Sequence, residues 1–136
     1  MKRLLIPCLI FLFFSCKKYI QKKEQNALEA VVTNGFWYVS GYEQNDSDIT
    51  SSFSGYLFKF DASNTVTATF GTSSATGQWS DNINNRTVTA NFPGAAAPLV
   101  YLNETWTITD SYPDSVAAKV VDTINHTTNI LQLKKQ

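Results

Sequence analysis

The chain has very few residues that can act as nucleophiles or as soft metal ligands. Its 136 residues include two cysteines, Cys8 and Cys16, and one histidine, His126. A zinc site built from several histidines cannot form from this set, and a catalytic Cys/His pair finds no support, because both cysteines lie in the first sixteen residues. His126 falls in a polar turn before the last predicted strand. We therefore expect no enzyme, no metal site and no cofactor.

The chain also lacks net charge, with eleven basic and eleven acidic residues. No basic patch argues for a DNA or RNA partner. The acidic residues form no recognisable site either. "NDSD" places Asp46 and Asp48 together as at the start of a calcium loop, but the glycine and the distant glutamate of that loop are missing, which favours a solvated turn.

Long hydrophobic runs are absent as well. Leu4 to Phe14 form the main apolar run, and as a helix it would span about 16 Å, roughly half of the hydrocarbon thickness of a bilayer. Lys2 and Arg3 precede it, which is the order of a secretory signal peptide. Phe13 does not suit the small-residue cleavage site of ordinary secreted proteins. The sequence therefore predicts a signal peptide over residues 1–15 whose cleavage site differs from that of ordinary secreted proteins.

The stretch "FFSC" followed by lysines resembles the lipobox of bacterial lipoproteins. The resemblance implies cleavage after Ser15, a diacylglyceryl group on the sulfur of Cys16 and a fatty acid, such as palmitate, on its amine. Two or more acyl chains give stable membrane attachment. The alternative is a secreted protein with a free N-terminal thiol. Cys8 leaves with the signal peptide, so one mature chain cannot form a disulfide.

The position of Lys17 bears on location, because lipoproteins retained in the inner membrane usually carry aspartate there. The resemblance thus implies the outer membrane, and the lack of an acidic run after Cys16 favours the periplasmic side over the cell surface. Residues 16–34 carry a net charge of +2 and residues 35–136 a net charge of −4. The basic stretch is either a tether that contacts anionic head groups or a solvated linker.

Beyond the tether, the hydrophobic period changes from helical to alternating. Residues 24–33 read as one short helix that ends near Asn34 and Gly35 and packs on or caps the domain after it. From Gly35 onward we count eight runs rich in β-branched and aromatic residues, which predict an all-β antiparallel meander over 35–136, closed as a barrel or folded as a sandwich. The stretch 93–103 interrupts the meander. The runs cover residues 36–42, 55–60, 65–70, 76–80, 86–92, 105–109, 115–121 and 129–134.

Alternation assigns sixteen side chains to an inner face, and eight of these are aromatic. Burial of this set stabilises the fold by roughly 30 kcal/mol before chain entropy is counted, so a core can form without disulfides. The inner set is Trp37, Val39, Tyr56, Phe58, Phe60, Val66, Ala68, Phe70, Trp79, Val88, Ala90, Phe92, Trp106, Ile108, Leu131 and Leu133.

The segment from "NGFWYVSGY" to "TGQWS" resembles the lipocalin-like domain of small bacterial lipoproteins. The matching features are Gly35-x-Trp37, the run from Asp48 to Phe60, Gly77-x-Trp79, the late Trp106 and the final "LQLKK". The likeness covers about residues 27–135. It implies an eight-stranded barrel that the N-terminal helix closes at one end. It also implies that a basic residue, here Lys135, packs on Trp37.

Function then depends on whether the barrel is hollow. Barrels of eight strands are either filled by side chains or hold one small ligand. The resemblance favours a lipid-anchored envelope protein that binds a small hydrophobic ligand in the barrel mouth. The alternative is a filled barrel that serves as an interaction, inhibitor or assembly module for an unknown protein partner. The candidate ligand-binding residues are Trp37, Tyr42, Phe53, Tyr56, Phe58, Trp79 and Trp106.

Overall fold

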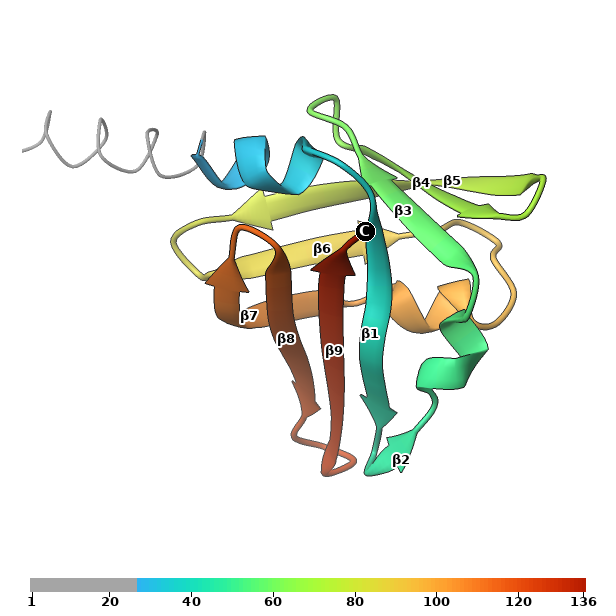
Figure 1. Cartoon of the computed structure of the whole chain (residues 1–136). Coiled ribbons are helices and arrows are strands. Elements are labelled where there is room, and N and C mark those ends of the chain that lie inside the picture. Colours follow the sequence, from blue (N-terminus) through green and yellow to red (C-terminus); the bar gives the residue numbers. More distant parts are fainter. Residues whose placement is uncertain (1–26) are drawn as a thin grey trace, which may run out of the picture.

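Eight strands form a closed antiparallel barrel in the computed structural model, which describes residues 27–136 (Figure 1). A short helix at residues 27–33 precedes the barrel, and one further strand, β2, extends it. Two 3-10 helices, η1 and η2, lie in its connections. In chain order the elements are β1 (Trp37–Gln44), β2 (Ser47–Asp48), η1 (Thr50–Phe53), β3 (Tyr56–Phe60), β4 (Thr65–Phe70), β5 (Ser73–Asn82), β6 (Thr87–Asn91), η2 (Leu99–Leu102), β7 (Thr105–Tyr112), β8 (Ser115–Asp122) and β9 (Thr127–Lys135).

The barrel closes through β1, which lies between β9 and β3. Its pairing with β9 runs from Trp37–Lys135 to Gln44–Asn129, whereas its pairing with β3 is limited to Trp37–Phe58. Beyond Trp37, η1 takes the place of the missing ladder: Tyr42 N donates to Thr50 Oγ1 at 2.9 Å, and Ile49 N donates to the carbonyl oxygen of Tyr42. The meander predicted from the sequence is therefore confirmed as a closed barrel.

All eight predicted strands are present, and five of them are longer than predicted, with the largest extensions in β5, β7 and β9. β5 begins at Ser73, β7 continues to Tyr112 and β9 begins at Thr127. These extensions consist mostly of serine, threonine, asparagine and aspartate, which read as turn residues in isolation. Because they lie opposite a partner strand, they continue the ladder. Neither β2 nor the two 3-10 helices was predicted.

The inner face follows the predicted alternation with two departures. Phe70, assigned to the inside, is 50 % exposed, because it ends β4 at the β4–β5 turn, where its ring contacts only the outer edge of the core through Tyr56 at 4.9 Å. Tyr42 is buried although it follows Val39 by three residues, since a bulge between Val39 and Gly41 shifts the phase of β1.

Two glycines allow close approach of neighbouring strands. At Gly41 a Cβ atom would lie 2.7 Å from Gln132 Oε1. At Gly77 it would lie 2.6 Å from the backbone oxygen of Asn91, so the Gly77-x-Trp79 pattern reflects a backbone approach that no other residue allows.

The stretch after β6 interrupts the meander as predicted, but it also adds to the core. η2 buries Leu99 and Leu102, which lie outside every predicted strand. Asn103 fixes this connection to the barrel: its Oδ1 accepts from Phe92 N at 2.6 Å, and its Nδ2 donates to Phe92 O at 3.1 Å.

The helical residues 27–33 cover one end of the barrel, which we call the helix end. Val31 and Val32 pack against the core, and the carbonyl oxygen of Val32 accepts from Trp37 Nε1 at 2.9 Å. The predicted cap is thus confirmed for residues 27–33, whereas residues 24–26 of the predicted helix lie outside the described part. The β3–β4 and β7–β8 turns and the C-terminus lie at the same end (Figure 1).

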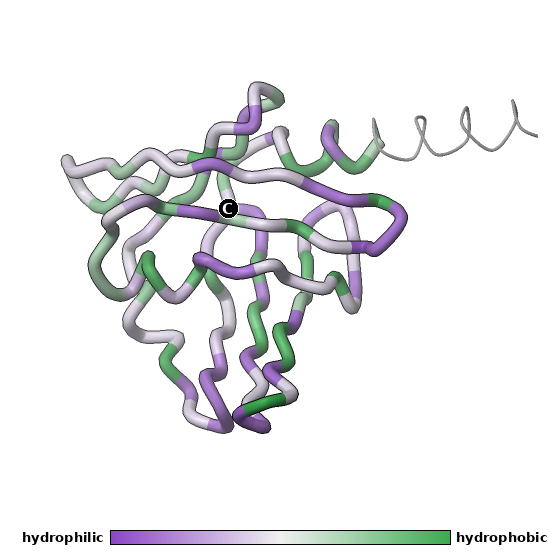
Figure 2. Tube along the Cα trace, turned by 180° about the vertical axis from the view of Figure 1, so that it is seen from behind, coloured by the Kyte–Doolittle hydropathy of each residue, from purple (hydrophilic) through white to green (hydrophobic). Residues whose placement is uncertain are grey.

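The opposite end, which we call the distal end, is formed by the β1–β2 and β8–β9 turns (Figure 1). Figure 2 shows hydrophilic residues concentrated at the strand tips of this end, interrupted by a strongly hydrophobic segment.

Candidate functional site

The interior of the barrel contains an apolar cavity of about 80 Å³. It lies under the helix, with Val32 in its wall, and all of its lining side chains are hydrophobic. Such a cavity offers no hydrogen bond that would orient a polar ligand. It is lined by Val32, Trp37, Phe58, Phe60, Val66, Val88, Ala90, Phe92, Leu102, Trp106, Ile108, Val116, Ala118, Leu131 and Leu133.

The volume limits what the cavity holds. A pocket for a drug-sized ligand has about 300 Å³ or more, and an engineered apolar cavity that binds benzene has about 150 Å³. The cavity in this barrel is therefore about half the size needed for one benzene molecule. Most of the interior is filled by side chains.

Three of the seven predicted ligand-binding residues, Trp37, Phe58 and Trp106, line the cavity. The other four lie elsewhere. Tyr56 is half-buried between Phe58 and Phe70. Trp79 is buried, and its Nε1 donates to the backbone oxygen of Asp61 at 2.9 Å.

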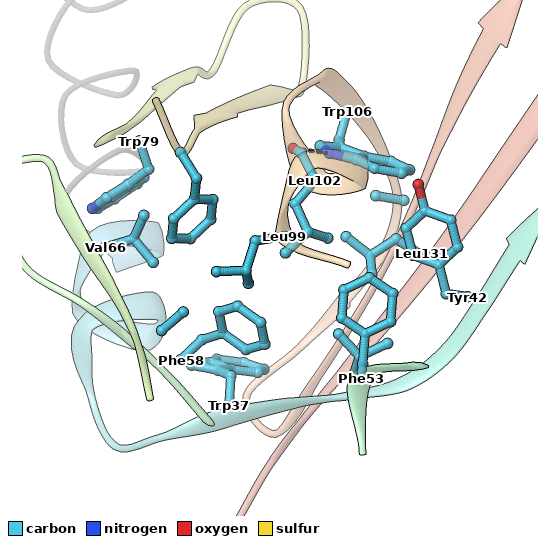
Figure 3. Packing of buried hydrophobic residues seen from close by; sticks show 14 residues of the cluster. Trp37, Tyr42, Phe53, Phe58, Val66, Trp79, Leu99, Leu102, Trp106 and Leu131 are labelled. Carbon is cyan, nitrogen blue, oxygen red and sulfur yellow. Dashed lines mark hydrogen bonds between the residues drawn. The ribbon is translucent and has the colours of Figure 1, made fainter. Parts of the chain in front are cut away.

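Tyr42 and Phe53, which we expected at an open barrel mouth, fill it instead (Figure 3). Their rings stack with 5.2 Å between the ring centroids, and the Tyr42 ring meets the Trp106 ring edge-on with 5.8 Å between the centroids. The hydroxyl of Tyr42 donates to the backbone oxygen of Tyr101 at 2.7 Å, and Trp106 Nε1 donates to Leu102 O at 3.1 Å. We call Tyr42, Phe53 and Trp106 the aromatic plug.

The electrostatics of the plug keep Tyr42 neutral. Burial, together with the negative charge of Glu104 and the nearby Tyr101, raises the pKa of Tyr42 to about 12. A hydroxyl with this pKa acts as a hydrogen-bond donor over the physiological range. Tyr42 is therefore a structural link between β1 and η2.

At the helix end, Lys135 packs on Trp37 as the resemblance implied. Its Nζ lies 5.2 Å from the centroid of the Trp37 ring, and the two residues are direct neighbours in the β1–β9 ladder. Lys59 ties the helix to β3, because its Nζ donates to the backbone oxygen of Thr33. These contacts fix the helix over the cavity.

A second hollow lies on the surface of the distal end. This groove has a volume of about 380 Å³ and lies between the start of β7 and the end of β8, where the two strands separate beyond the Thr107–Lys119 pair. Val121 and Ile124 beside it are 53 % and 87 % exposed. We call this hollow the distal groove. It is lined by Glu104, Val120, Val121, Asp122, Thr123, Ile124, Thr127 and Asn129.

Sequence reasoning missed the distal groove. Its residues come from the end of β8, the β8–β9 turn, the start of β9 and the residue before β7, and nothing in their spacing joins them. One signal was present, because Ile124 is an isolated aliphatic residue in the otherwise polar turn "TINHTTN".

The "NDSD" stretch folds as a turn rather than as a cation loop. Asn45 and Asp46 have positive φ angles of 47° and 68°, and Asp48 accepts from Thr50 N at 2.9 Å. Hydrogen bonds from Thr50 lower the pKa of Asp48. Within residues 27–136, no three His, Cys, Asp or Glu side chains gather to hold a metal ion. His126 is exposed in the β8–β9 turn.

The predicted lipidation site, Cys16, lies outside the described residues, as does the predicted signal peptide. In residues 27–136 no helix has the length and hydrophobicity to cross a membrane.

The barrel has a counterpart among solved structures. The chain is similar to the crystal structure of a DUF4847 family protein from Bacteroides vulgatus, with a TM-score of 0.55 and 15% sequence identity over 80% of this chain and 99% of that chain. No family model matches the chain, and no curated protein is significantly similar to it. At this identity the likeness shows the fold alone, which is a closed eight-stranded antiparallel barrel.

Proposed function

We propose that the protein is a lipid-anchored protein of the outer membrane whose filled barrel serves as an interaction module, with the distal groove as its contact site for a periplasmic protein. The observation that carries this proposal is the aromatic plug together with a cavity of only about 80 Å³. A barrel mouth that is filled and hydrogen-bonded favours contact through the outer surface.

The distal groove supports this choice. Val121 and Ile124 are exposed aliphatic residues beside Glu104 and Asp122. Apolar side chains that are exposed next to charged ones are typical of protein interfaces. The chemistry suits a partner segment that carries an aliphatic or aromatic side chain and a neighbouring basic one.

Photo-crosslinking in cells tests the groove. A photoreactive residue at Thr123, which lies in the groove wall between Asp122 and Ile124, should capture one discrete protein. The double variant Val121→Ser/Ile124→Ser should reduce that adduct severalfold, while the same probe at the exposed Thr72 of the β4–β5 turn serves as the control position. An adduct that persists in the double variant, or no adduct at Thr123, would contradict the proposal.

The anchor has its own test, with a matched pair of cysteines in one chain. Cys16→Ser should abolish acyl labelling and release the protein from membranes. Cys8→Ser should leave both unchanged, because Cys8 belongs to the predicted signal peptide. Membrane retention without acylation in Cys16→Ser would overturn the lipoprotein assignment and leave the groove proposal standing.

A second candidate function is the binding of a small apolar ligand, and the wholly hydrophobic lining of the internal cavity favours it. Native mass spectrometry of the purified lipoprotein separates the two. We expect no copurifying lipid or displaceable apolar probe in the wild-type barrel. Leu102→Ala removes part of the cavity wall, which enlarges the cavity and should allow a benzene-sized probe to bind. A stoichiometric apolar ligand in the wild-type protein would show that the barrel is hollow and contradict the filled-barrel proposal.

A further inference from the structure

The outer surface near the helix end carries three exposed aromatic residues. Phe36, Tyr38 and Tyr112 are 48 %, 37 % and 60 % exposed. Large aromatic side chains in water are unusual enough to need an explanation when several share one surface.

The strand register brings two of them into one row. Tyr38 pairs with Lys134, Lys134 pairs with Ser115, and Ser115 pairs with Tyr112. Directly paired residues point to the same face of a sheet, so this row crosses β1, β9, β8 and β7 on the outside of the barrel.

Phe36 and Lys59 extend the row on its other side. Phe36 precedes the inward Trp37, and Lys59 Nζ lies 5.9 Å from the centroid of the Phe36 ring. Phe36, Tyr38, Tyr112, Lys59 and Lys134 together form what we call the aromatic band. Aromatic rings with lysines beside them are typical of the boundary between lipid head groups and acyl chains.

The chain also enters the barrel at this end. Only residues 17–26 separate Cys16 from the first described residue, and ten residues span at most about 35 Å when fully extended. An acyl anchor on Cys16 would therefore hold the helix end, and not the distal end, within reach of the bilayer.

Charge favours the same orientation. The distal end carries Glu43, Asp46, Asp48, Glu104 and Asp122 against Lys119. The helix end has no net charge, with Lys59, Arg86, Lys134 and Lys135 against Glu29, Asp61, Asp81 and Asp114. A bilayer that contains anionic lipids repels the distal end much more strongly than the helix end.

We propose that the aromatic band docks on the bilayer interface, so that the barrel stands on the membrane with its distal groove directed away from it. The inference rests on the proposed lipid anchor. It adds a defined membrane-contact face and a fixed orientation of the barrel to that anchor.

The test uses the acylated protein in vesicles of phosphatidylethanolamine and phosphatidylglycerol. Cys8 leaves with the signal peptide and the sulfur of Cys16 is blocked by its lipid, so an introduced cysteine is the one free thiol. Ser115→Cys places a polarity-sensitive fluorophore inside the row without removing a band residue, and Thr123→Cys places it at the distal end. Lipids that carry a quencher in the acyl chain report contact with the bilayer.

We expect the fluorophore at 115 to be quenched at least severalfold more than the one at 123, and to lose that difference in the Tyr38→Ser/Tyr112→Ser background. The matched background Val121→Ser/Ile124→Ser should leave it unchanged. Equal quenching at the two positions, or no effect of the band substitutions, would overturn the docked orientation. Mass measurement of the acyl groups on the same sample decides separately whether the anchor is present.

Discussion

The helix end and the distal end of the barrel are each fixed by a buried aromatic residue of β1. Trp37 donates to Val32 O and lies under Lys135, whereas Tyr42 donates to Tyr101 O and stacks on Phe53. Both residues are 1 % exposed. Their partners differ, because Trp37 holds the helix that leads back to the predicted anchor, while Tyr42 holds the connections η1 and η2.

This difference supports the two proposals, which assign membrane attachment to the helix end and partner recognition to the distal end. The helix end has no net charge and an exposed aromatic band, and the distal end is acidic and carries a groove. A barrel whose interior is filled can still present two unlike surfaces, since alternation leaves the outer face of every strand free to vary.

The largest effect is expected at the helix end. Trp37→Ala should lower the free energy of unfolding by about 3–5 kcal/mol, because it removes a large buried ring and the hydrogen bond to Val32 O. Urea denaturation measures the loss. Amide exchange should also rise in residues 27–33 under native conditions.

The neighbouring Phe36→Ala is the control, since Phe36 is 48 % exposed. It should cost less than about 1 kcal/mol. If the two variants lost similar stability, Trp37 would not be the residue that fixes this end.

A smaller effect is expected at the distal end. Tyr42→Phe keeps the ring and its stacking but leaves the buried oxygen of Tyr101 without its donor. The loss should be about 1–3 kcal/mol at neutral pH. Urea denaturation at pH 7 measures it, and a stability equal to that of the wild-type protein would show that water replaces the lost donor.

Alkaline pH sharpens the test of Tyr42. Its pKa is about 12 in the folded protein against 10.0 as the ordinary value, so above pH 10 the unfolded chain releases this proton first. The contribution of the neutral Tyr42 hydroxyl to the free energy of unfolding is complete below pH 10 and is lost as the pH rises to about 12, a change of roughly 2–3 kcal/mol. The stability advantage of the wild-type protein over Tyr42→Phe should therefore shrink across this window. A constant difference would contradict the raised pKa, because the other tyrosines and the lysines are common to both proteins.

The alternation was sufficient to predict an antiparallel meander because its signal is local, whereas the choice of a barrel over a sandwich came from the resemblance to lipocalin-like domains. Eight alternating runs and the inward face were readable residue by residue. A basic residue on Trp37 was implied by the resemblance to lipocalin-like domains, and the phase of Leu131 and Leu133 only selected Lys135 for that place. The plug was not readable, because the bulge between Val39 and Gly41 depends on how Gln132 fits against a glycine in the opposite strand. The filled mouth likewise depends on η2. Its leucines, Leu99 and Leu102, belong to no alternating run and therefore read as loop residues in the sequence.

The two surface sites, the aromatic band and the distal groove, also depend on how strands pair and not only on local sequence. For the aromatic band, alternation along one strand can show that a given side chain points outward, but it cannot show which outward side chains are neighbours. The register of β1, β9, β8 and β7 brings Tyr38 and Tyr112 into one row. The distal groove lies where the β7–β8 pairing stops, and the spacing of its lining residues along the chain does not reveal where that pairing stops.

The smallest effect is expected in the β8–β9 turn, which forms one wall of the distal groove. Asp122 Oδ1 accepts from Ile124 N at 2.9 Å and from Asn125 N at 3.1 Å, and its Oδ2 accepts from Asn125 Nδ2 at 2.7 Å. These hydrogen bonds, with the Asn125 side chain first, lower the pKa of Asp122. The stabilisation of the turn by the ionised Asp122 carboxylate is thus present at neutral pH and is lost as the pH falls through the lowered pKa of this group.

Asp122→Asn should make the turn open more readily while the rest of the barrel stays unchanged. Amide exchange of Ile124 and Asn125 should speed up in the variant, and the exchange of Val32 at the helix end should not. Acidification of the wild-type protein should produce the same local loosening after correction for the intrinsic exchange rate, and Asp122→Asn should abolish that pH dependence. If both ends loosened together in acid, the two ends would form one cooperative unit, and the groove could not be altered independently of the helix end.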